Sequence, residues 1–439
     1  MSNLIVIKQK LKNFNKKITV SGDKSLSIRW VLFSSIADGV SKAHNLLMSD
    51  DVYAAIDAIK KLGVKVTIKK NLCKIFGNGI NGYKYKKNLV INAQNSGTLG
   101  RLILGLLVSS PTTIKLIGDK SLSKRDFERV TRPLKKFGVT FKLNKNKGLP
   151  LTIKGSNKLK AINYLEDKGS AQCKSSIIFA GMKSAGTTFI KAKKSRNHTE
   201  LLCKYLNLPI NVTTKNNYDF IRINNVKKIK PLNYNIPSDI SSSAFFMVLT
   251  ALSKKSKLTI KNVNINPSRT GVITILKKMG VIILFKNTKI YKGERIADIH
   301  IKSPGNLKPI NCPKKLNSGA IDEFLVIFLL AAKAKGISSF KDLAELNQKE
   351  SPRLQWGAKI LNEMGIKTIL TNNSIRIFGN PNLEINKKII IKDYLKDHRV
   401  FMTSIIAALS FGGEWYIHDK DSIKTSFPLF LNIVDSLKK

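Results

Sequence analysis

The sequence of 439 residues predicts an α/β protein of two lobes, each built from three βαβαββ repeats. Two recurring patterns support this fold class. One is a polar entrance that leads into an almost uniformly apolar helix, and the other is an amphipathic helix that ends in glycine before a β-rich hairpin. Each repeat therefore contains one buried and one surface helix.

The clearest copy of the first pattern is Asn95-Ser96-Gly97-Thr98-Leu99-Gly100-Arg101, which leads into the apolar residues 102–108. Ser96 and Thr98 are candidate helix caps, and the two glycines allow a ligand to approach the backbone. The free N–H groups of a first helical turn attract anions, and Arg101 adds full charge. Six copies recur 69 to 83 residues apart, marked by Lys24, Gly97, Ser170, Asp239, Asp322 and His398.

The second pattern also recurs in most repeats. Its four glycine-ended helices close at Gly63, Gly138, Gly280 and Gly365. Lysine near a helix end suits the negative pole of the helix dipole. Short β-rich runs follow, such as residues 64–69 with 73–76 and residues 367–370 with 374–378, and these predict hairpins. The third copy, Tyr205-Leu206-Asn207-Leu208-Pro209, has lost the glycine.

Six such units cannot bury their apolar faces alone, and the chain is long enough for two cores. We expect a first lobe over residues 21–236 and a second lobe over residues 237–439, with residues 1–20 joining the second lobe. If the buried helices of each lobe run parallel, their positive ends gather on one face. Two such faces pointing at an interdomain cleft would suit highly anionic ligands.

The composition is strongly basic, with 77 Lys and Arg against 28 Asp and Glu and a formal net charge of +49. Such a balance raises the possibility of nucleic-acid binding. However, lysine is spread over the whole chain, without a basic tail or an arginine-rich stripe, which indicates a general compositional bias. We therefore expect no nucleic-acid partner, although the charge should speed the arrival of anionic substrates.

Four isolated cysteines (Cys73, Cys173, Cys203 and Cys312) lack CxxC spacing and predict reduced core thiols. The histidines show no HExxH or other ligand spacing, so no metal is expected. The longest apolar run, residues 324–332, is too short to span a bilayer, and little chain precedes the first repeat. These features predict a cytoplasmic protein without a membrane segment, and we expect a monomer.

Six stretches together resemble, in order and spacing, the motif series of the EPSP synthase (3-phosphoshikimate 1-carboxyvinyltransferase) family. They are Gly22-Asp23-Lys24-Ser25-Leu26-Ser27-Ile28-Arg29, Asn95-Ser96-Gly97-Thr98, Ser170-Ala171-Gln172-Cys173-Lys174-Ser175, Ser195-Arg196-Asn197-His198-Thr199-Glu200, Lys349-Glu350-Ser351-Pro352-Arg353 and Asp397-His398-Arg399. Each motif alone is ordinary, but the ordered series is specific and covers nearly the whole chain.

The resemblance implies the two-lobed enolpyruvyl transferase fold and a step of the shikimate pathway, which leads to chorismate and the aromatic amino acids. In that step the enolpyruvyl group of phosphoenolpyruvate moves to the 5-hydroxyl of 3-phosphoshikimate, and phosphate is released. The family requires no cofactor and no metal. Two substrates that each carry a phosphate and a carboxylate call for several converging Arg and Lys side chains.

The resemblance also implies site residues. For 3-phosphoshikimate they are Lys24, Ser25, Arg29, Ser170, Ala171, Gln172, Arg196, Asp322 and Lys349. For phosphoenolpyruvate they are Lys24, Gly97, Arg125, Gln172, Arg353, Arg399 and Lys424. Asp322 is implied as the base, Glu350 as the acid, and Lys24 and His398 as supporting catalytic groups. Glyphosate occupies the phosphoenolpyruvate site in this family, and alanine at the position matching Gly97 is associated with tolerance. Residues 170–175 and 195–200 resemble the second, often tolerant class, so the two cues conflict. We weigh the local steric cue above the class label, and the glycine at position 97 therefore predicts inhibition.

Each of these residues also has a plainer interpretation. Asp322 could be the N-cap of a helix that begins at Glu323, and His398 could cap its own helix. Lys349 and Glu350 could be a solvated loop pair. Arg125 alone is part of a basic turn. Only the joint occurrence of the motifs favours the functional interpretation.

Five positions depart from the family pattern: Ile28, Gly100, Ser123, Asp126 and Pro352. Pro352 is the most consequential, because it removes an N–H next to Arg353 and restricts Ser351 to extended geometry. The closest rival is the UDP-N-acetylglucosamine enolpyruvyl transferase family. That family uses a cysteine in a loop of the first lobe, whereas residues 118–125 here contain none.

Overall fold

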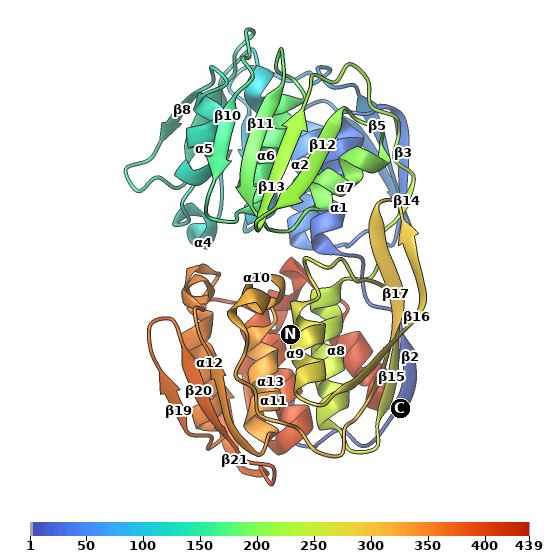
Figure 1. Ribbon diagram of the computed structural model, residues 1–439, viewed down its shortest axis with the longest axis vertical. Coiled ribbons are helices and arrows are strands. Elements are labelled where there is room, and N and C mark those ends of the chain that lie inside the picture. Colours follow the sequence, from blue (N-terminus) through green and yellow to red (C-terminus); the bar gives the residue numbers. More distant parts are fainter. Residues whose placement is uncertain (1–2, 439) are drawn as a thin grey trace. The chain divides into compact units, whose positions relative to one another are not determined.

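The computed structural model describes residues 3–438, which divide into two compact units (Figure 1). The first lobe comprises Gly22–Ile236 together with Tyr291–Glu294. The second lobe comprises the remaining described residues. The chain passes from one lobe to the other at residues 21–22, 236–237, 290–291 and 294–295.

The first lobe contains three four-stranded sheets with one shared design: one parallel pair and two antiparallel pairs. The first is β14(Tyr234–Asn235)-β3(Asp38–His44)-β5(Leu72–Asn78)-β4(Lys65–Lys69). The second is β6(Val90–Asn92)-β7(Ile114–Ile117)-β9(Leu151–Lys154)-β8(Thr140–Leu143). The third is β10(Asn163–Glu166)-β11(Thr188–Lys193)-β13(Tyr218–Ile223)-β12(Ile210–Lys215). The same strand order in all three is the structural form of the repeat.

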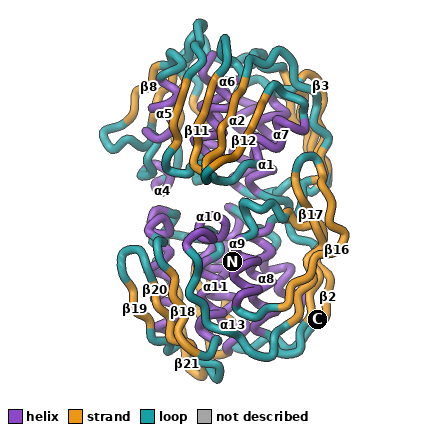
Figure 2. Tube along the Cα trace, in the orientation of Figure 1, coloured by secondary structure: helices purple, strands orange, loops and turns teal. Residues whose placement is uncertain are grey.

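The second lobe also has three sheets. They are β16(Ile282–Tyr291)-β17(Glu294–Lys302)-β15(Lys257–Asn264)-β2(Asn15–Ile18), β18(Gly336–Phe340)-β20(Ile375–Gly379)-β19(Thr368–Leu370) and β1(Leu4–Ile7)-β22(Gly412–His418)-β21(Ile385–Ile391). The N-terminal strands β1 and β2 both pair inside this lobe. Figure 2 shows the helices of this lobe lying between the β18-β20-β19 sheet and the β16-β17-β15-β2 sheet.

Two strands are exchanged between the repeats that open the lobes. Strand β2 precedes the first helix of the first lobe but pairs in parallel with β15 of the second lobe. Strand β14 precedes the first helix of the second lobe but pairs in parallel with β3 of the first. The sixth repeat also differs from the expected pattern, because β1 supplies its antiparallel strand in place of a hairpin of its own.

Six helices are apolar on nearly all sides and form the centres of the lobes. They are α1(Lys24–Ser35), α3(Gly97–Leu106) and α6(Ala171–Gly181) in the first lobe, and α8(Ile240–Leu252), α11(Phe324–Lys333) and α13(His398–Phe411) in the second. A helix buried all round needs apolar residues on every face, as these sequences provide. Each lobe has its own continuous hydrophobic core.

The polar entrances begin these helices as the sequence predicts, and most are capped by side chains. Asp23, Ser96, Ser170, Asp239 and Asp397 each accept a hydrogen bond from a backbone N–H of the first turn. Such caps satisfy donors that have no partner within the helix. The prediction for Thr98 as a cap was wrong, since it lies inside α3.

Two of the plainer interpretations are also wrong. Helix α11 has Glu323 at its N-cap position without a side-chain cap, so Asp322 does not cap it. Helix α13 is capped by Asp397, whose carboxylate accepts from the N–H of Arg399, so His398 is not the cap. The side chains of Asp322 and His398 therefore contact groups other than the backbone N–H groups of these helix ends.

The glycine-ended helices and their hairpins are confirmed. Gly63, Gly138, Gly280 and Gly365 all have positive φ, the conformation that glycine adopts at low cost. In the third repeat Asn207, with φ of +54°, takes the place of the missing glycine. Asparagine tolerates this region better than other side chains, which explains why the helix still ends there.

The fold-class prediction is confirmed: the chain is α/β, with repeated βα units and mixed sheets in two lobes. The expected interdomain cleft stays a prediction. Among residues 3–438, no helix is both long and apolar enough to cross a membrane.

Candidate active site

In the first lobe, hydrogen bonds join the N-terminal turns of the three buried helices. The amide of Gln172 on α6 donates through Nε2 to Oγ1 of Thr98 on α3 at 3.1 Å. Arg29 on α1 donates to Oγ of Ser175 on α6 at 3.1 Å. The positive ends of α1, α3 and α6 therefore gather at one place, which suits an anionic ligand.

Arg29 is the most tightly held cation of this group and is 3% exposed. Its Nε donates to Oγ1 of Thr199 at 2.8 Å, and its Nη1 donates to the carbonyl oxygen of Ser25 at 3.1 Å. Burial lowers the pKa of Arg29 to about 10, against the opposing charges of nearby carboxylates. The guanidinium therefore stays charged at neutral pH while its bonded partners are neutral.

Lys24 and Ser25 form the first turn of α1 and are both partly exposed. The Nζ of Lys24 lies 3.0 Å from Oδ2 of Asp51, at the start of α2(Asp50–Lys61). This ion pair fixes the ammonium group of Lys24 at the N-terminal end of α1. The capping carboxylate of Asp23 lies in the same turn and accepts from the N–H of Leu26 at 2.9 Å.

Gly97 begins α3 beside two guanidinium groups. A methyl group at this position would lie 3.1 Å from Nη1 of Arg125 and 3.3 Å from Nη1 of Arg101. The absence of a side chain therefore makes room for the arginines. Arg101 is itself engaged: it donates to Oε1 of Gln172 at 2.6 Å and to the carbonyl oxygen of Asp126 at 3.2 Å.

The remaining first-lobe predictions lie at the entrances of α6 and α7(His198–Tyr205). Ser170 caps α6, and Ala171 and Gln172 are half-buried in its first turn. The N–H of Ser170 donates to Oε2 of Glu166 at 2.9 Å. Arg196 is half-buried two residues before α7 begins.

In the second lobe, one buried guanidinium contacts three carboxylates. Arg353 begins α12(Arg353–Glu363) and is 2% exposed. Asp397 accepts from its Nε at 2.8 Å and from its Nη2 at 3.2 Å, so the pair is bidentate. Glu350 accepts from Nη2, and Oδ1 of Asp322 lies 3.5 Å from Nη1. The two predicted proton-transfer residues therefore contact the two terminal nitrogens of one guanidinium.

The charges in this cluster support one another. Burial opposes the charge of Arg353, but Asp397 and Glu350 outweigh it and raise the pKa of the guanidinium. Burial likewise opposes the charge of Asp397, but Arg353 outweighs it and holds the pKa of that carboxyl below its usual value. A buried pair of this kind is stable only when both partners are present.

The other second-lobe predictions surround this cluster. Nζ of Lys349 lies 3.3 Å from Oδ1 of Asp322, and Nη1 of Arg399 donates to the carbonyl oxygen of Asp322 at 2.6 Å. Nδ1 of His398 lies 3.3 Å from Oγ1 of Thr425. Lys424 is exposed in the 3₁₀ helix η4(Lys420–Thr425), and the structure gives it no contact with the arginine cluster among residues 3–438.

The departures from the family pattern are accommodated by local packing. Ile28 is fully buried in α1. At Gly100 an added Cβ would lie 3.3 Å from the ring of Phe127, so that ring fills the space beside the helix. Ser123 donates to the carbonyl oxygen of Gly118 at 3.2 Å, and Asp126 accepts from the N–H of Glu128 at 2.7 Å.

Pro352 is the N-cap residue of α12, where a backbone N–H is not needed by the helix. Its carbonyl oxygen accepts from the N–H of Trp356 at 3.0 Å. Ser351 donates its N–H and its hydroxyl to Oδ2 of Asp397, at 3.2 and 2.9 Å. The proline therefore leaves the arginine cluster intact.

Several residues with clear structural roles at the site were missed from the sequence. They are Asp51, Ser175, Thr199, Glu323 and Asp397. Ser175, Thr199 and Asp397 lie in motifs already singled out, but a linear motif does not tell which arginine its hydroxyl or carboxylate will reach. Asp51 carries no distinguishing spacing, and no sequence signal points to it.

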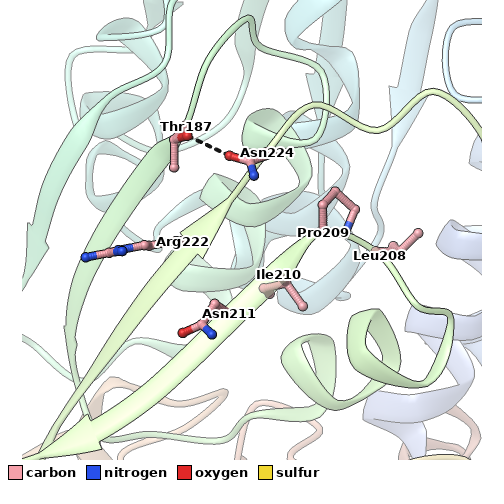
Figure 3. Close-up of a pocket in the computed structure, with 7 residues that line it drawn as sticks. All are labelled: Thr187, Leu208, Pro209, Ile210, Asn211, Arg222 and Asn224. Atoms are coloured by element: carbon pink, nitrogen blue, oxygen red, sulfur yellow. Dashed lines mark hydrogen bonds between the residues drawn. The ribbon is translucent and has the colours of Figure 1, made fainter.

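A pocket of about 520 Å³ lies elsewhere on the first lobe, lined by Thr187, Leu208, Pro209, Ile210, Asn211, Arg222 and Asn224 (Figure 3). Thr188 of β11 pairs with Ile223 of β13, whereas Lys193, at the other end of β11, leads toward Arg196. The pocket is therefore at the end of the sheet away from the predicted site, and none of its lining residues was predicted to bind substrate.

The fold defines the class of protein. The chain matches a solved EPSP synthase from Acinetobacter baumannii with a TM-score of 0.87 and 36% identity, over 99% of this chain and 98% of that one. It also matches the enolpyruvyl transferase NikO from Streptomyces tendae with a TM-score of 0.77 over 100% and 98% of the two chains, where 13% identity shows the fold alone. The fold is that of the enolpyruvyl transferases.

The sequence comparisons narrow the class to one family. The family model of EPSP synthase (3-phosphoshikimate 1-carboxyvinyltransferase) matches residues 8–434. A relative of that name from Ruthia magnifica is 39% identical over 96% of this chain and 94% of its own length. Another from Caldicellulosiruptor bescii is 37% identical over 98% of both chains. The chain belongs to the EPSP synthase family, as the motif series predicted.

Proposed function

We propose how the residues of the two lobes perform the reaction of this family. The chain is a transferase that moves the enolpyruvyl group of phosphoenolpyruvate to 3-phosphoshikimate in the shikimate pathway. The finer assignment, residue by residue, is our proposal. The main observation in support of this assignment is that Asp322 and Glu350 contact the two terminal nitrogens of the Arg353 guanidinium.

The first lobe supplies groups that hold anions. Arg29, Lys24, Ser25, Ser170, Ala171, Gln172 and Arg196 bind 3-phosphoshikimate in this proposal, and Lys24, Gly97, Arg125 and Gln172 contact phosphoenolpyruvate. The gathered N-terminal turns of α1, α3 and α6 support this role, because charged and dipolar donors converge there. Three of the five N–H groups of Arg29 are used inside the lobe, which leaves two for a phosphate or carboxylate.

The second lobe supplies the proton-transfer groups together with further cations. Lys349 and Asp322 contact 3-phosphoshikimate in this proposal, and Arg353, Arg399 and Lys424 contact phosphoenolpyruvate. His398 and Lys24 support the proton transfers. Asp322 contacts Lys349 and Arg353. In this proposal Asp322 acts as the base in its ionised form, and Glu350 acts as the acid in its protonated form.

In the addition step, Asp322 takes the proton of the 5-hydroxyl while the oxygen attacks the carbon of phosphoenolpyruvate that bears the phosphate. Glu350 gives a proton to the methylene carbon, which becomes a methyl group. In the elimination step, Glu350 takes a proton back from that methyl group, the carbon–oxygen bond to phosphate breaks, and Asp322 returns its proton to the departing phosphate. Protons balance, and the carboxyvinyl ether and phosphate remain.

Phosphate release tests the proposal. With phosphoenolpyruvate and 3-phosphoshikimate, we expect phosphate and the carboxyvinyl ether in equal amounts, and no release with UDP-N-acetylglucosamine as acceptor. Release with the nucleotide sugar would favour the rival family's substrate. Salt-sensitive binding of DNA or RNA without any phosphate release would favour the nucleic-acid alternative.

We also propose that the protein is a cytoplasmic monomer. All four cysteines are buried free thiols, as suits a reducing compartment. Sedimentation velocity at several protein concentrations should give a single species with the mass of one chain.

A further inference from the structure

Helix α7 opens with three consecutive buried polar residues, and each has a partner on a different segment. Glu200 pairs with Lys174 of α6, with 2.7 Å between Oε1 and Nζ. Thr199 accepts from Nε of Arg29 on α1 and lies 2.7 Å from Oγ of Ser175. The first of the three, His198, reaches a segment that none of the motifs predicted.

The partner of His198 is Glu294, and both side chains are fully buried. Nδ1 of the imidazole lies 2.7 Å from Oε1 of the glutamate. Within residues 3–438, Nε2 of His198 has no hydrogen-bond partner. An ionised carboxylate can only accept a hydrogen bond, so Nδ1 carries the proton that His198 donates to Glu294.

Glu294 lies at the tip of the β16–β17 hairpin, and this tip belongs to the first lobe although its strands belong to the second. Tyr291 stacks on Tyr234 with 5.6 Å between ring centroids. Lys292 donates to the hydroxyl of Tyr205 on α7 at 3.1 Å. At Gly293, with φ of +85°, a Cβ would lie 2.7 Å from the carbonyl oxygen of Leu201. The tip is therefore fitted closely against α7.

We propose that Glu294 is a positioning residue for Arg29, acting through His198 and the first turn of α7. The inference rests on the proposed function, in which Arg29 binds 3-phosphoshikimate. Its physical basis is direct adjacency: Thr199, which orients Arg29 through a 2.8 Å bond, is the next residue after His198. Hydrogen bonds weaken steeply when distance and angle change, so a shift of this turn would release the guanidinium.

Charge provides a second link between these groups. Burial lowers the pKa of Arg29, and the carboxylates of Glu200, Asp23 and Glu294 act in the opposite direction. Glu294 therefore stabilises the charged form of Arg29 as well as its orientation.

The test compares three substitutions at Glu294 with a control at the same hairpin tip. Glu294→Ala removes the acceptor, Glu294→Asp withdraws it by one methylene group, and Glu294→Gln keeps an acceptor oxygen at the same reach. Lys292→Ala removes a tip contact that does not involve His198. We would measure the dissociation constant for 3-phosphoshikimate by calorimetry, the Michaelis constant for each substrate, kcat and Tm.

We expect Glu294→Ala and Glu294→Asp to weaken binding of the shikimate substrate, raising its dissociation constant and its Michaelis constant about tenfold. The turnover number and the Michaelis constant for phosphoenolpyruvate should stay within about twofold of the wild type. Glu294→Gln should recover most of the loss, with a rise of about threefold or less. Lys292→Ala should bind as the wild type does. A folded Glu294→Asp protein with unchanged affinity, or equal rises in both Michaelis constants, would overturn the inference.

The failure of this inference is distinguishable from failure of the proposed function. Wild-type protein that does not bind 3-phosphoshikimate, or an Arg29→Met variant that binds it normally, would contradict the assignment of Arg29 itself. Loss of binding in Arg29→Met with normal binding in every folded Glu294 variant would contradict only the role of Glu294. If Glu294→Ala does not fold, the Asp and Gln variants decide.

Discussion

Arg29, in the second turn of α1 in the first lobe, and Arg353, at the start of α12 in the second, are both almost fully buried, but they are held differently. Arg29 is bonded by two hydroxyl groups and a backbone carbonyl, and burial lowers its pKa to about 10. Arg353 contacts three carboxylates, which raise its pKa against the effect of burial. The first arrangement leaves positive charge for a ligand, whereas the second compensates the charge and brings acids together.

This difference implies a division of tasks. A guanidinium whose hydrogen-bond partners are neutral attracts phosphate and carboxylate strongly, because no carboxylate is bonded to it. A guanidinium with carboxylate partners orients those carboxylates for proton transfer. The predictions below test whether the division holds, beginning with the largest expected effect.

Neutralising the base should have the largest effect. Asp322→Asn keeps the size of the side chain but removes its ability to take a proton, so turnover should fall about 10²- to 10⁴-fold. The Tm should change little, because Asp322 is only half-buried. Steady-state phosphate release provides the measurement. Turnover near that of the wild type would remove Asp322 from the proposed mechanism.

The second prediction compares stability losses at the two arginines. Arg353→Met leaves Asp397 buried without its guanidinium, which should cost about 3–5 kcal/mol of unfolding free energy. Arg29→Met leaves mainly hydroxyl and carbonyl groups without a donor and should cost about 1–3 kcal/mol. Urea denaturation of both variants gives the comparison. Equal losses would mean that the difference in partners has no energetic consequence.

The third prediction concerns Gly97. A methyl group there would press on Arg125 and Arg101, at 3.1 and 3.3 Å from their Nη1 atoms. We expect wild-type protein to be inhibited by glyphosate in competition with phosphoenolpyruvate. Gly97→Ala should raise the inhibition constant by about tenfold or more, at a steric cost of about 1–3 kcal/mol. The Michaelis constant for phosphoenolpyruvate should rise less, by about threefold, because glyphosate is the longer ligand and the added methyl group projects toward it.

Equal inhibition of the wild type and Gly97→Ala would show that position 97 does not border the inhibitor. Ser123→Ala offers a matched control in the same part of the lobe, because its hydroxyl donates to the carbonyl oxygen of Gly118 and to no group of the arginine pair. It should leave the inhibition constant unchanged.

The smallest effect is expected from Lys183, a further first-lobe cation with neutral partners. It bonds to the hydroxyl of Ser109 at 3.1 Å, and burial lowers its pKa from 10.5 to about 8. Below pH 8 the ammonium group is charged in both states, but burial makes this charge unfavourable in the folded state. The free energy of unfolding therefore rises as pH increases from about 8 to 10.5. Lys183→Met should be more stable than the wild type at pH 7, with the gain lost toward pH 10.5. Urea denaturation at pH 7 and pH 10 checks this, and equal gains at both pH values would contradict it.

Lys174 supplies the contrasting case in the same lobe. Burial opposes its charge, but Glu200 and Asp219 outweigh it and raise its pKa. Lys174→Met should therefore destabilise the protein, by about 3–5 kcal/mol, because two carboxylates lose their partner. A stabilising effect of Lys174→Met in urea denaturation would contradict this account of buried charge.

The sequence predicted the repeat, the helix entrances and the family, because hydrophobic periodicity and capping residues are local signals. It could not predict that β2 and β14 pair in the lobe opposite to the helix that each precedes, because strand exchange depends on long-range pairing. At the site, the motifs indicated the residue types. They did not indicate that Asp397 would hold Arg353, nor that Glu294 would reach His198 across 96 residues of chain.

The division between the two arginines is tested most directly by measuring binding and turnover on the same preparations. Calorimetry with 3-phosphoshikimate alone, followed by phosphate release with both substrates, would be applied to wild-type, Arg29→Met and Glu350→Gln proteins. We predict that Arg29→Met raises the dissociation constant for 3-phosphoshikimate about 100-fold. Glu350→Gln should bind within about twofold of the wild type while its turnover falls about 100-fold or more. Normal binding by Arg29→Met, or a loss of binding in Glu350→Gln as large as its loss of turnover, would contradict the account.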